Sequence, residues 1–139
     1  MHASSGSLIF KNLDDSCCSV VFDKRDRIEF EIYGENPEHG LYSIDFGVTG
    51  LKELPVAVWT DKNSVVVQLP SFRLSQGEWR SSGEDKPVIK VGDVVSLQHF
   101  DETMFVSINK GPVWSVNVGP GRVRFCAQLR YKDQALWVL

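Results

Sequence analysis

This sequence has no long run of apolar residues. None of its apolar stretches approaches the roughly 18 to 20 residues that a membrane-spanning helix needs, and the N-terminus lacks the basic and then apolar order of a signal peptide. We therefore expect a soluble, cytoplasmic chain that does not insert into a membrane. The small, polar opening MHASSGS (residues 1–7) looks like a cloning remnant or linker, which leaves residues 8–139 as a single domain.

Cysteine and strong net charge are also scarce. Cys17 and Cys18 are adjacent and Cys126 is distant, a spacing that fits no zinc motif and leaves an odd thiol in any disulfide pairing. We therefore expect reduced, buried cysteines and no metal or other cofactor. The net charge of −3 provides no concentrated basic surface, which argues against nucleic acid as a partner.

Motifs for catalysis are missing as well. The three histidines have no partners at metal-ligand spacing, and we expect His99 to be a core-edge residue with a satisfied hydrogen bond. Ser81-Ser82-Gly83 is not the Gly-x-Ser-x-Gly nucleophile elbow, and the acidic pairs Asp14-Asp15 and Asp101-Glu102 lie in predicted turns. The sequence therefore predicts a protein that is not an enzyme.

What the sequence does contain is a strict alternation of apolar and other residues. It is clearest in RIEFEI (residues 27–32) and recurs over residues 42–48, 104–108 and 123–130. A period of two predicts half-buried β-strands, and no stretch of ten or more residues has the spacing of an amphipathic helix. Turn residues separate these runs at short intervals.

Two hairpins can be predicted individually. Residues 94–100 and 103–109 are joined through Asp101-Glu102, and the second of these strands turns through Lys110-Gly111 into residues 112–118. Together with the alternation, these turns predict an all-β fold, a lectin-like antiparallel β-sandwich of roughly ten to twelve short strands.

Basic residues share one face of the last predicted long strand. Arg122, Arg124 and Arg130 are in phase along it. One interpretation is an outer face exposed to solvent, and the other is a contact with an anionic group or an acidic peptide. The sequence leaves both open.

Several of these segments are similar to those of a known family. They occur in the same order, over about 120 residues, as SVVF (19–22), RIEFEI (27–32), YSIDFGVT (42–49), GEWRSSG (77–83), KVGDVV (90–95) and FVSINKG (105–111). The chain resembles the neuralized homology repeat, a SPRY-like β-sandwich carried by neuralized-type ubiquitin ligases and adaptors. In that family the segment around Trp79 lies between two turns, while an alternative alignment would put Trp59 in its place.

The resemblance implies a protein-interaction module that recognises a protein or peptide partner for ubiquitin ligation. A galectin-like carbohydrate-binding module is the alternative, because residues 98–101 (QHFD) and Trp114 are faintly similar to a galectin site. Met104 and Asn117 stand near the places where a galectin has arginine and glutamate, so sugar hydroxyls would lose their charged partners.

Large aromatic residues beside arginine are the best candidates for partner contacts, because Trp, Tyr and Arg dominate binding hot spots. The candidates, all in or next to predicted loops, are Trp59, Phe72, Arg73, Trp79, Arg80 and Trp114. Each tryptophan could instead cap the core, and Trp137 is expected inside it. Replacing Arg73 or Arg80 by alanine should weaken partner binding and leave thermal stability nearly unchanged.

Overall fold

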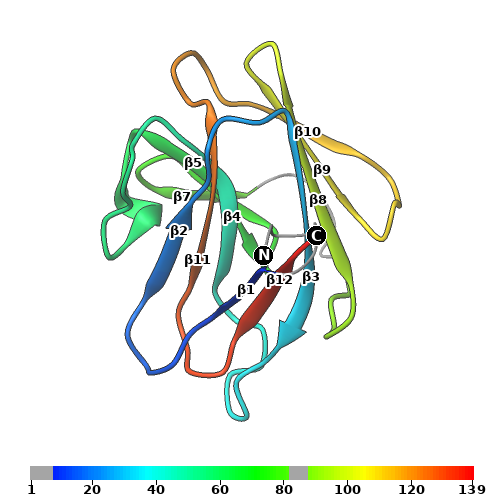
Figure 1. Cartoon of the computed structure of the whole chain (residues 1–139). Coiled ribbons are helices and arrows are strands. Elements are labelled where there is room, and N and C mark those ends of the chain that lie inside the picture. Colours follow the sequence, from blue (N-terminus) through cyan, green and yellow to red (C-terminus); the bar gives the residue numbers. More distant parts are fainter. Residues whose placement is uncertain (1–7, 82–87) are drawn as a thin grey trace.

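The computed structural model of the chain describes residues 8–81 and 88–139, and for residues 80 and 81 only the backbone (Figure 1). Twelve strands and one 3-10 helix, η1 (Val58–Thr60), lie in these ranges. No helix in them is long and apolar enough to cross a bilayer. The predicted all-β class is thus confirmed, with the predicted number of strands.

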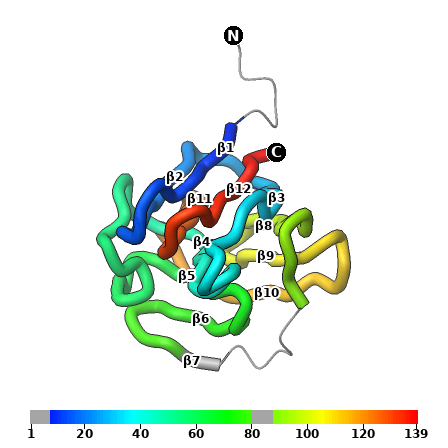
Figure 2. The backbone as a smooth tube through the Cα atoms, turned by 90° about the horizontal axis from the view of Figure 1, so that it is seen from below, coloured from blue at the N-terminus to red at the C-terminus, as the bar shows by residue number. Residues whose placement is uncertain are grey.

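Two six-stranded antiparallel sheets make up the sandwich, as the view in Figure 2 shows most clearly. Sheet A has the strand order β1 (Leu8–Lys11), β12 (Ala135–Val138), β3 (Arg27–Gly34), β8 (Val94–Phe100), β9 (Thr103–Ile108) and β10 (Trp114–Asn117). Sheet B has the order β2 (Cys18–Val21), β11 (Arg124–Leu129), β4 (Ile44–Thr49), β5 (Ser64–Leu69), β6 (Arg73–Ser75) and β7 (Trp79–Ser81).

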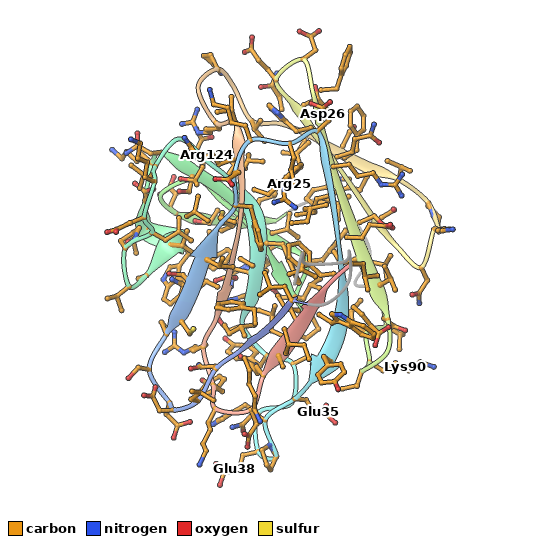
Figure 3. The ribbon with its side chains drawn as sticks, in the orientation of Figure 1. Arg25, Asp26, Glu35, Glu38, Lys90 and Arg124 are labelled. Carbon is orange, nitrogen blue, oxygen red and sulfur yellow. The ribbon has the colours of Figure 1, made fainter. Side chains whose placement is uncertain are left out.

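The alternating residues fill the space between the sheets. Ile28, Phe30 and Ile32 of β3 are buried there, and the Phe30 ring lies 5.2 Å from that of Phe46 on β4 in the facing sheet. Burial of this apolar area is the main stabilising contribution. Of the charged residues labelled in Figure 3, Asp26 and Arg124 lie at one end of the sandwich and Glu35 and Glu38 at the other.

Both predicted hairpins form. Asp101 and Glu102, at φ 49° and 61°, turn β8 into β9, as a two-residue hairpin turn requires. Asn109 and Lys110 also have positive φ, and β9 then pairs with β10. The strand predicted over residues 42–48 starts later than expected, because Ser43 has a φ of 63° and Tyr42 is exposed in the turn before β4.

The central strands of sheet B are covered on both faces. Every residue of β4 and β5 is buried, because residues 51–63, which we call the strap, cross the outer face of this sheet. A second small apolar cluster forms beneath the strap from Val58, Val66 and Cys126. The strand Ser64–Leu69 was therefore missed by the alternation pattern, since a strand buried on both sides need not alternate.

The outer face of sheet A carries Trp137, which corrects one expectation. Leu136 and Val138 point into the core, so Trp137 between them points outward. Its ring is only partly buried and meets Tyr33 edge to face at 5.9 Å. The cysteines are all unpaired, as expected, but only Cys126 is buried, whereas Cys17 and Cys18 are half-buried.

Candidate partner-binding surface

The strap is fixed to sheet B by buried side chains of the strands. Gln128 on β11 accepts a hydrogen bond from the backbone N–H of Val58 (3.2 Å) and donates one to the carbonyl of Pro55 (3.1 Å). From β6, the Ser75 hydroxyl donates a hydrogen bond to the backbone carbonyl of Trp59. These bonds satisfy buried polar groups and set the position of the Trp59 indole.

Four side chains meet where the strap crosses β6 and β7. The rings of Trp59 and Trp79 are stacked, with centroids 6.4 Å apart and planes 22° apart. The guanidinium carbon of Arg73 lies 5.2 Å from the centroid of Trp79, and that of Arg130 lies 5.3 Å from that of Trp59. We call Arg73, Trp79, Trp59 and Arg130 the Trp–Arg cluster. Both contacts lie within the range of attraction between a cation and an aromatic face.

The cluster is anchored on its inner side and open on its outer side. Both indoles are half-buried and pack on the small apolar cluster of Val58, Val66 and Cys126. Arg73 is exposed and Arg130 half-buried. Trp59 and Trp79 are thus held in place by packing, while part of the surface of each faces solvent.

Asp45 lies on the same face of sheet B, under this surface. Its cross-strand neighbours are Gln68 and Gln128, and it is 1% exposed. Neither carboxyl oxygen has a hydrogen-bond partner among the described residues. Burial raises the pKa of Asp45 to about 7, and the positive charge of Arg130 lowers that pKa only in part. Asp45 is therefore partly protonated at neutral pH.

The aromatic surface continues past Arg130. The guanidinium carbon of Arg130 also lies 5.7 Å from the centroid of Tyr131, whose ring stacks on that of His39 at 3.9 Å. His39 and Tyr131 line a shallow depression, together with Glu38, at the end of the sandwich where Figure 3 labels Glu38. Arg130 therefore connects the indoles to a second pair of rings.

Three of the predicted contact residues, Trp59, Arg73 and Trp79, come together in the cluster. Phe72 is instead buried and lies against Trp114 with ring centroids 4.7 Å apart, on the inner side of the sheets. These two rings therefore adopt the core-capping role. Arg80 is opposite Leu74 in the sheet register, and its side chain lies outside the described residues.

Sequence reasoning put Arg130 on a basic strand face and did not connect it with the tryptophans. The connection depends on strand register, because Arg130 comes directly after β11, in phase with Cys126 and Gln128 on its outer face, where the strap crosses. A usable signal was present in the sequence. Gln128 and Arg130 alternate with the apolar residues Ala127 and Leu129 and so had to share the outer face.

Three of the residues behind the galectin comparison lie toward the core. Trp114 packs on the core, and Met104 is fully buried. His99 lies on the core side of β8 in phase with Leu97, and its Nε2 is buried with no hydrogen-bond partner among the described residues. The expectation of a satisfied hydrogen bond is wrong for that nitrogen.

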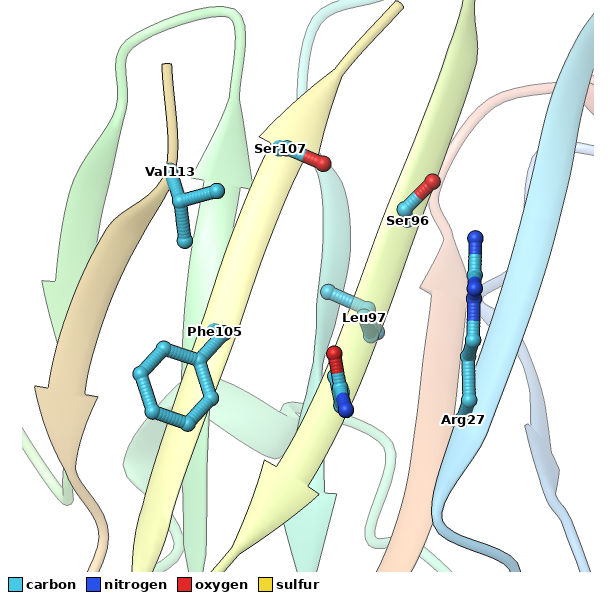
Figure 4. A pocket seen from close by; sticks show the side chains of 7 residues that line it. Arg27, Ser96, Leu97, Phe105, Ser107 and Val113 are labelled. Carbon is cyan, nitrogen blue, oxygen red and sulfur yellow. The ribbon is translucent and has the colours of Figure 1, made fainter. Parts of the chain in front are cut away.

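The open face of sheet A carries a shallow groove (Figure 4). It is lined by Arg27, Ser96, Leu97, Gln98, Phe105, Ser107 and Val113, with a volume of about 130 Å³. Its charged group is already paired, because Glu29 accepts a hydrogen bond from Ser96 (2.6 Å) and lies 3.3 Å from the Arg27 guanidinium. The Ser96 bond, followed by Arg27, lowers the pKa of Glu29. This groove therefore has no unmatched charge to offer a ligand.

No protein-family model matches this chain, and no curated protein matches it. Solved structures similar to it include the SPRY domain of human HERC1, with 11% identity, a TM-score of 0.68 and coverage of 94% of this chain and 86% of that chain. A human SPRY domain has 14% identity and a TM-score of 0.67, with coverage of 94% of this chain and 89% of that chain. The TRIM65 PSpry domain has 12% identity and a TM-score of 0.59, with coverage of 91% of this chain and 72% of that chain. At such identities the likeness concerns the fold, and the fold is the SPRY-type β-sandwich.

Proposed function

We propose that this chain is a non-catalytic protein-interaction module and that it binds a protein partner through the Trp–Arg cluster. The observation that carries the proposal is the presence of two fixed, half-buried indoles, each with a guanidinium over its ring. Tryptophan and arginine are the residue types most enriched in binding hot spots. Because the strap already fixes Trp59, little side-chain entropy remains to be lost on binding.

The resemblance to the neuralized homology repeat supports a more specific context. We propose that the module recognises substrate or partner proteins for a neuralized-type ubiquitin ligase or adaptor, with transfer of ubiquitin performed by another domain. The structural similarity to SPRY domains supports the fold of such a module, and experiment has to identify the partner. The three unpaired cysteines agree with a cytoplasmic location.

Affinity capture from a cell lysate tests this proposal when it compares matched variants. The baits are the wild-type chain, the double variant Arg73→Ala/Arg130→Ala and the control Arg27→Ala, each checked for folding by thermal melting. Arg27 is a suitable control because it is also an exposed arginine but lies on the other sheet.

We expect mass spectrometry to find at least one protein retained by the wild type and by Arg27→Ala but lost with the double variant. If the three baits retain the same proteins, the Trp–Arg cluster is not the binding surface. Retention of ligase components along with that protein would support the ubiquitin context.

A further inference from the structure

We propose that the Trp–Arg cluster recognises an acidic segment of its partner, with one carboxylate bound by Arg73 and a second by Arg130. This inference rests on the proposed function and adds the chemistry of the partner. The two guanidiniums are held in the same way. Each lies over a single indole, Arg73 over Trp79 and Arg130 over Trp59.

A guanidinium that lies over an aromatic ring still has N–H donors along its edge. Those donors match the two oxygens of a carboxylate in a bidentate arrangement. The indoles therefore orient the two arginines without using up their donors. Because the indoles are fixed by the packing beneath them, both guanidiniums are preorganised for an anion.

Among the described residues, neither guanidinium has an ion-pair or hydrogen-bond partner. The ion pairs found in the described part of the chain are Lys11–Asp133, Arg27–Glu29 and His39–Glu38, and no hydrogen bond from Arg73 or Arg130 side chains is found there. Arg122 shows the contrast, since it donates to the carbonyls of Val118 and Lys62. Asp45 does not neutralise Arg130 fully, because burial keeps it partly protonated.

The geometry limits the spacing of the two carboxylates. The successive separations from Arg73 to Trp79 (5.2 Å), to Trp59 (6.4 Å) and to Arg130 (5.3 Å) place the guanidiniums at most about 17 Å apart. An extended peptide advances about 3.3 Å per residue. We propose that the partner segment binds in an extended form, so that its two acidic residues lie no more than about five residues apart.

The arrangement favours carboxylates over a phosphate group. A phosphorylated side chain has a charge of about −2 and is bound best by several convergent donors. Arg73 and Arg130 contact different indoles, so each is suited to one singly charged carboxylate. A phosphopeptide is therefore an outcome of the test that would count against the proposal.

Selection of peptides tests this inference directly. Random 12-residue peptides displayed on phage are selected on the wild-type chain and then synthesised with a fluorescent label. Their affinities are measured for the wild type, Arg73→Ala, Arg130→Ala, Arg130→Lys and the control Arg27→Ala. The same peptides are made with Asn and Gln in place of Asp and Glu, and with phosphoserine in place of one acidic residue.

We expect enriched peptides with two acidic residues within about five positions of each other. Binding should weaken about 10-fold or more with either alanine variant and with the Asn/Gln peptides, and be unchanged with Arg27→Ala. Arg130→Lys should recover only part of the loss, because lysine lacks the planar, bidentate group.

Other results would overturn the inference and would also separate it from the proposed function. Neutral peptides that lose binding with the alanine variants would contradict acidic recognition but leave the cluster as the binding surface. Peptides that bind all variants equally would contradict both proposals. Failure to enrich any peptide, or a phosphoserine form that binds 10-fold more tightly than its acidic parent, would also contradict acidic recognition.

Discussion

At the scale of single residues, the buried carboxyl of Asp45 makes the stability of the fold depend on pH. Its pKa is raised from 3.8 to about 7, chiefly by burial. Between these values the unfolded chain has lost the proton and the folded chain keeps it, so the free energy of unfolding falls as pH rises from about 4 to about 7. Above pH 7 both states are ionised and this contribution no longer changes.

Asp45→Asn should remove this dependence. One pKa unit corresponds to 1.36 kcal/mol, so the wild type should lose roughly 2 to 4 kcal/mol between pH 4 and 8. The asparagine variant, which has no charge to bury, should be the more stable protein at pH 8 and about equal to the wild type at pH 4. Urea unfolding at a series of pH values measures this. Parallel curves for the two proteins would show that Asp45 is not the titrating group.

Arg130 should act on the same titration, whereas Arg73 should not. Arg130 lowers the pKa of Asp45 through its charge, so Arg130→Ala should move the fall in stability to higher pH. Arg73→Ala should leave the pH profile unchanged and cost at most about 1 kcal/mol, because Arg73 is exposed and gives up its contact with Trp79. Urea unfolding of both variants at the same series of pH values measures this difference. An identical profile for both variants would mean that Arg130 does not influence Asp45.

At the scale of elements, the strap depends on Gln128. Replacing Gln128 by alanine removes both hydrogen bonds that position Pro55 and Val58 and leaves the Val58 N–H without a partner, at a cost of about 2 to 3 kcal/mol. Hydrogen exchange at the Val58 amide should accelerate more than exchange in β3. Gln68→Ala is the matched control, since Gln68 is buried on the same face but bonds to Ser43 and Ser71. Equal acceleration in both variants would contradict this role.

The pairing of β4 with β5 depends on a glycine. A Cβ on Gly47 would lie 2.0 Å from the backbone oxygen of Val65, so Gly47→Ala must push the two strands apart. We expect a loss of about 3 kcal/mol in the free energy of unfolding. At Gly121 a Cβ meets nothing within 4 Å, and only its positive φ of 81° opposes alanine, at about 1 kcal/mol. Similar losses at the two positions, measured by urea unfolding, would contradict this account.

The strands were predictable wherever apolar residues alternate with polar residues, glycine or cysteine. Residues 27–32 alternate because one face of β3 packs on the core and the other is open. Residues 64–69 also form a strand, but they do not alternate, because the strap buries their second face. A contact between such distant segments leaves no local pattern in the sequence. For the candidate surface, too, local features of the sequence were readable and contacts between distant segments were not. Trp59, Arg73 and Trp79 were identifiable by residue type, whereas Arg130 needed the register of β11 and the path of the strap.

At the scale of the whole molecule, the sandwich brings together residues that the sequence could not rank. The alignment to the neuralized homology repeat left open whether Trp59 or Trp79 takes the family position. In the folded chain the two rings stack 6.4 Å apart, so both choices lead to the same surface. The net charge of −3 means that Arg73 and Arg130, which have no ion-pair partner in the part of the chain that the structure describes, are a local basic feature. Binding of an acidic partner should therefore weaken as salt screens them.

The central claim is that this one surface contacts the partner, and the four tryptophans allow a direct test. In ¹H–¹⁵N NMR spectra each indole N–H gives its own signal, and the partner or selected peptide is added stepwise. We predict that the signals of Trp59 and Trp79 move during the titration while those of Trp114 and Trp137 stay in place. Movement of Trp114 or Trp137 with Trp59 and Trp79 unchanged would contradict the account.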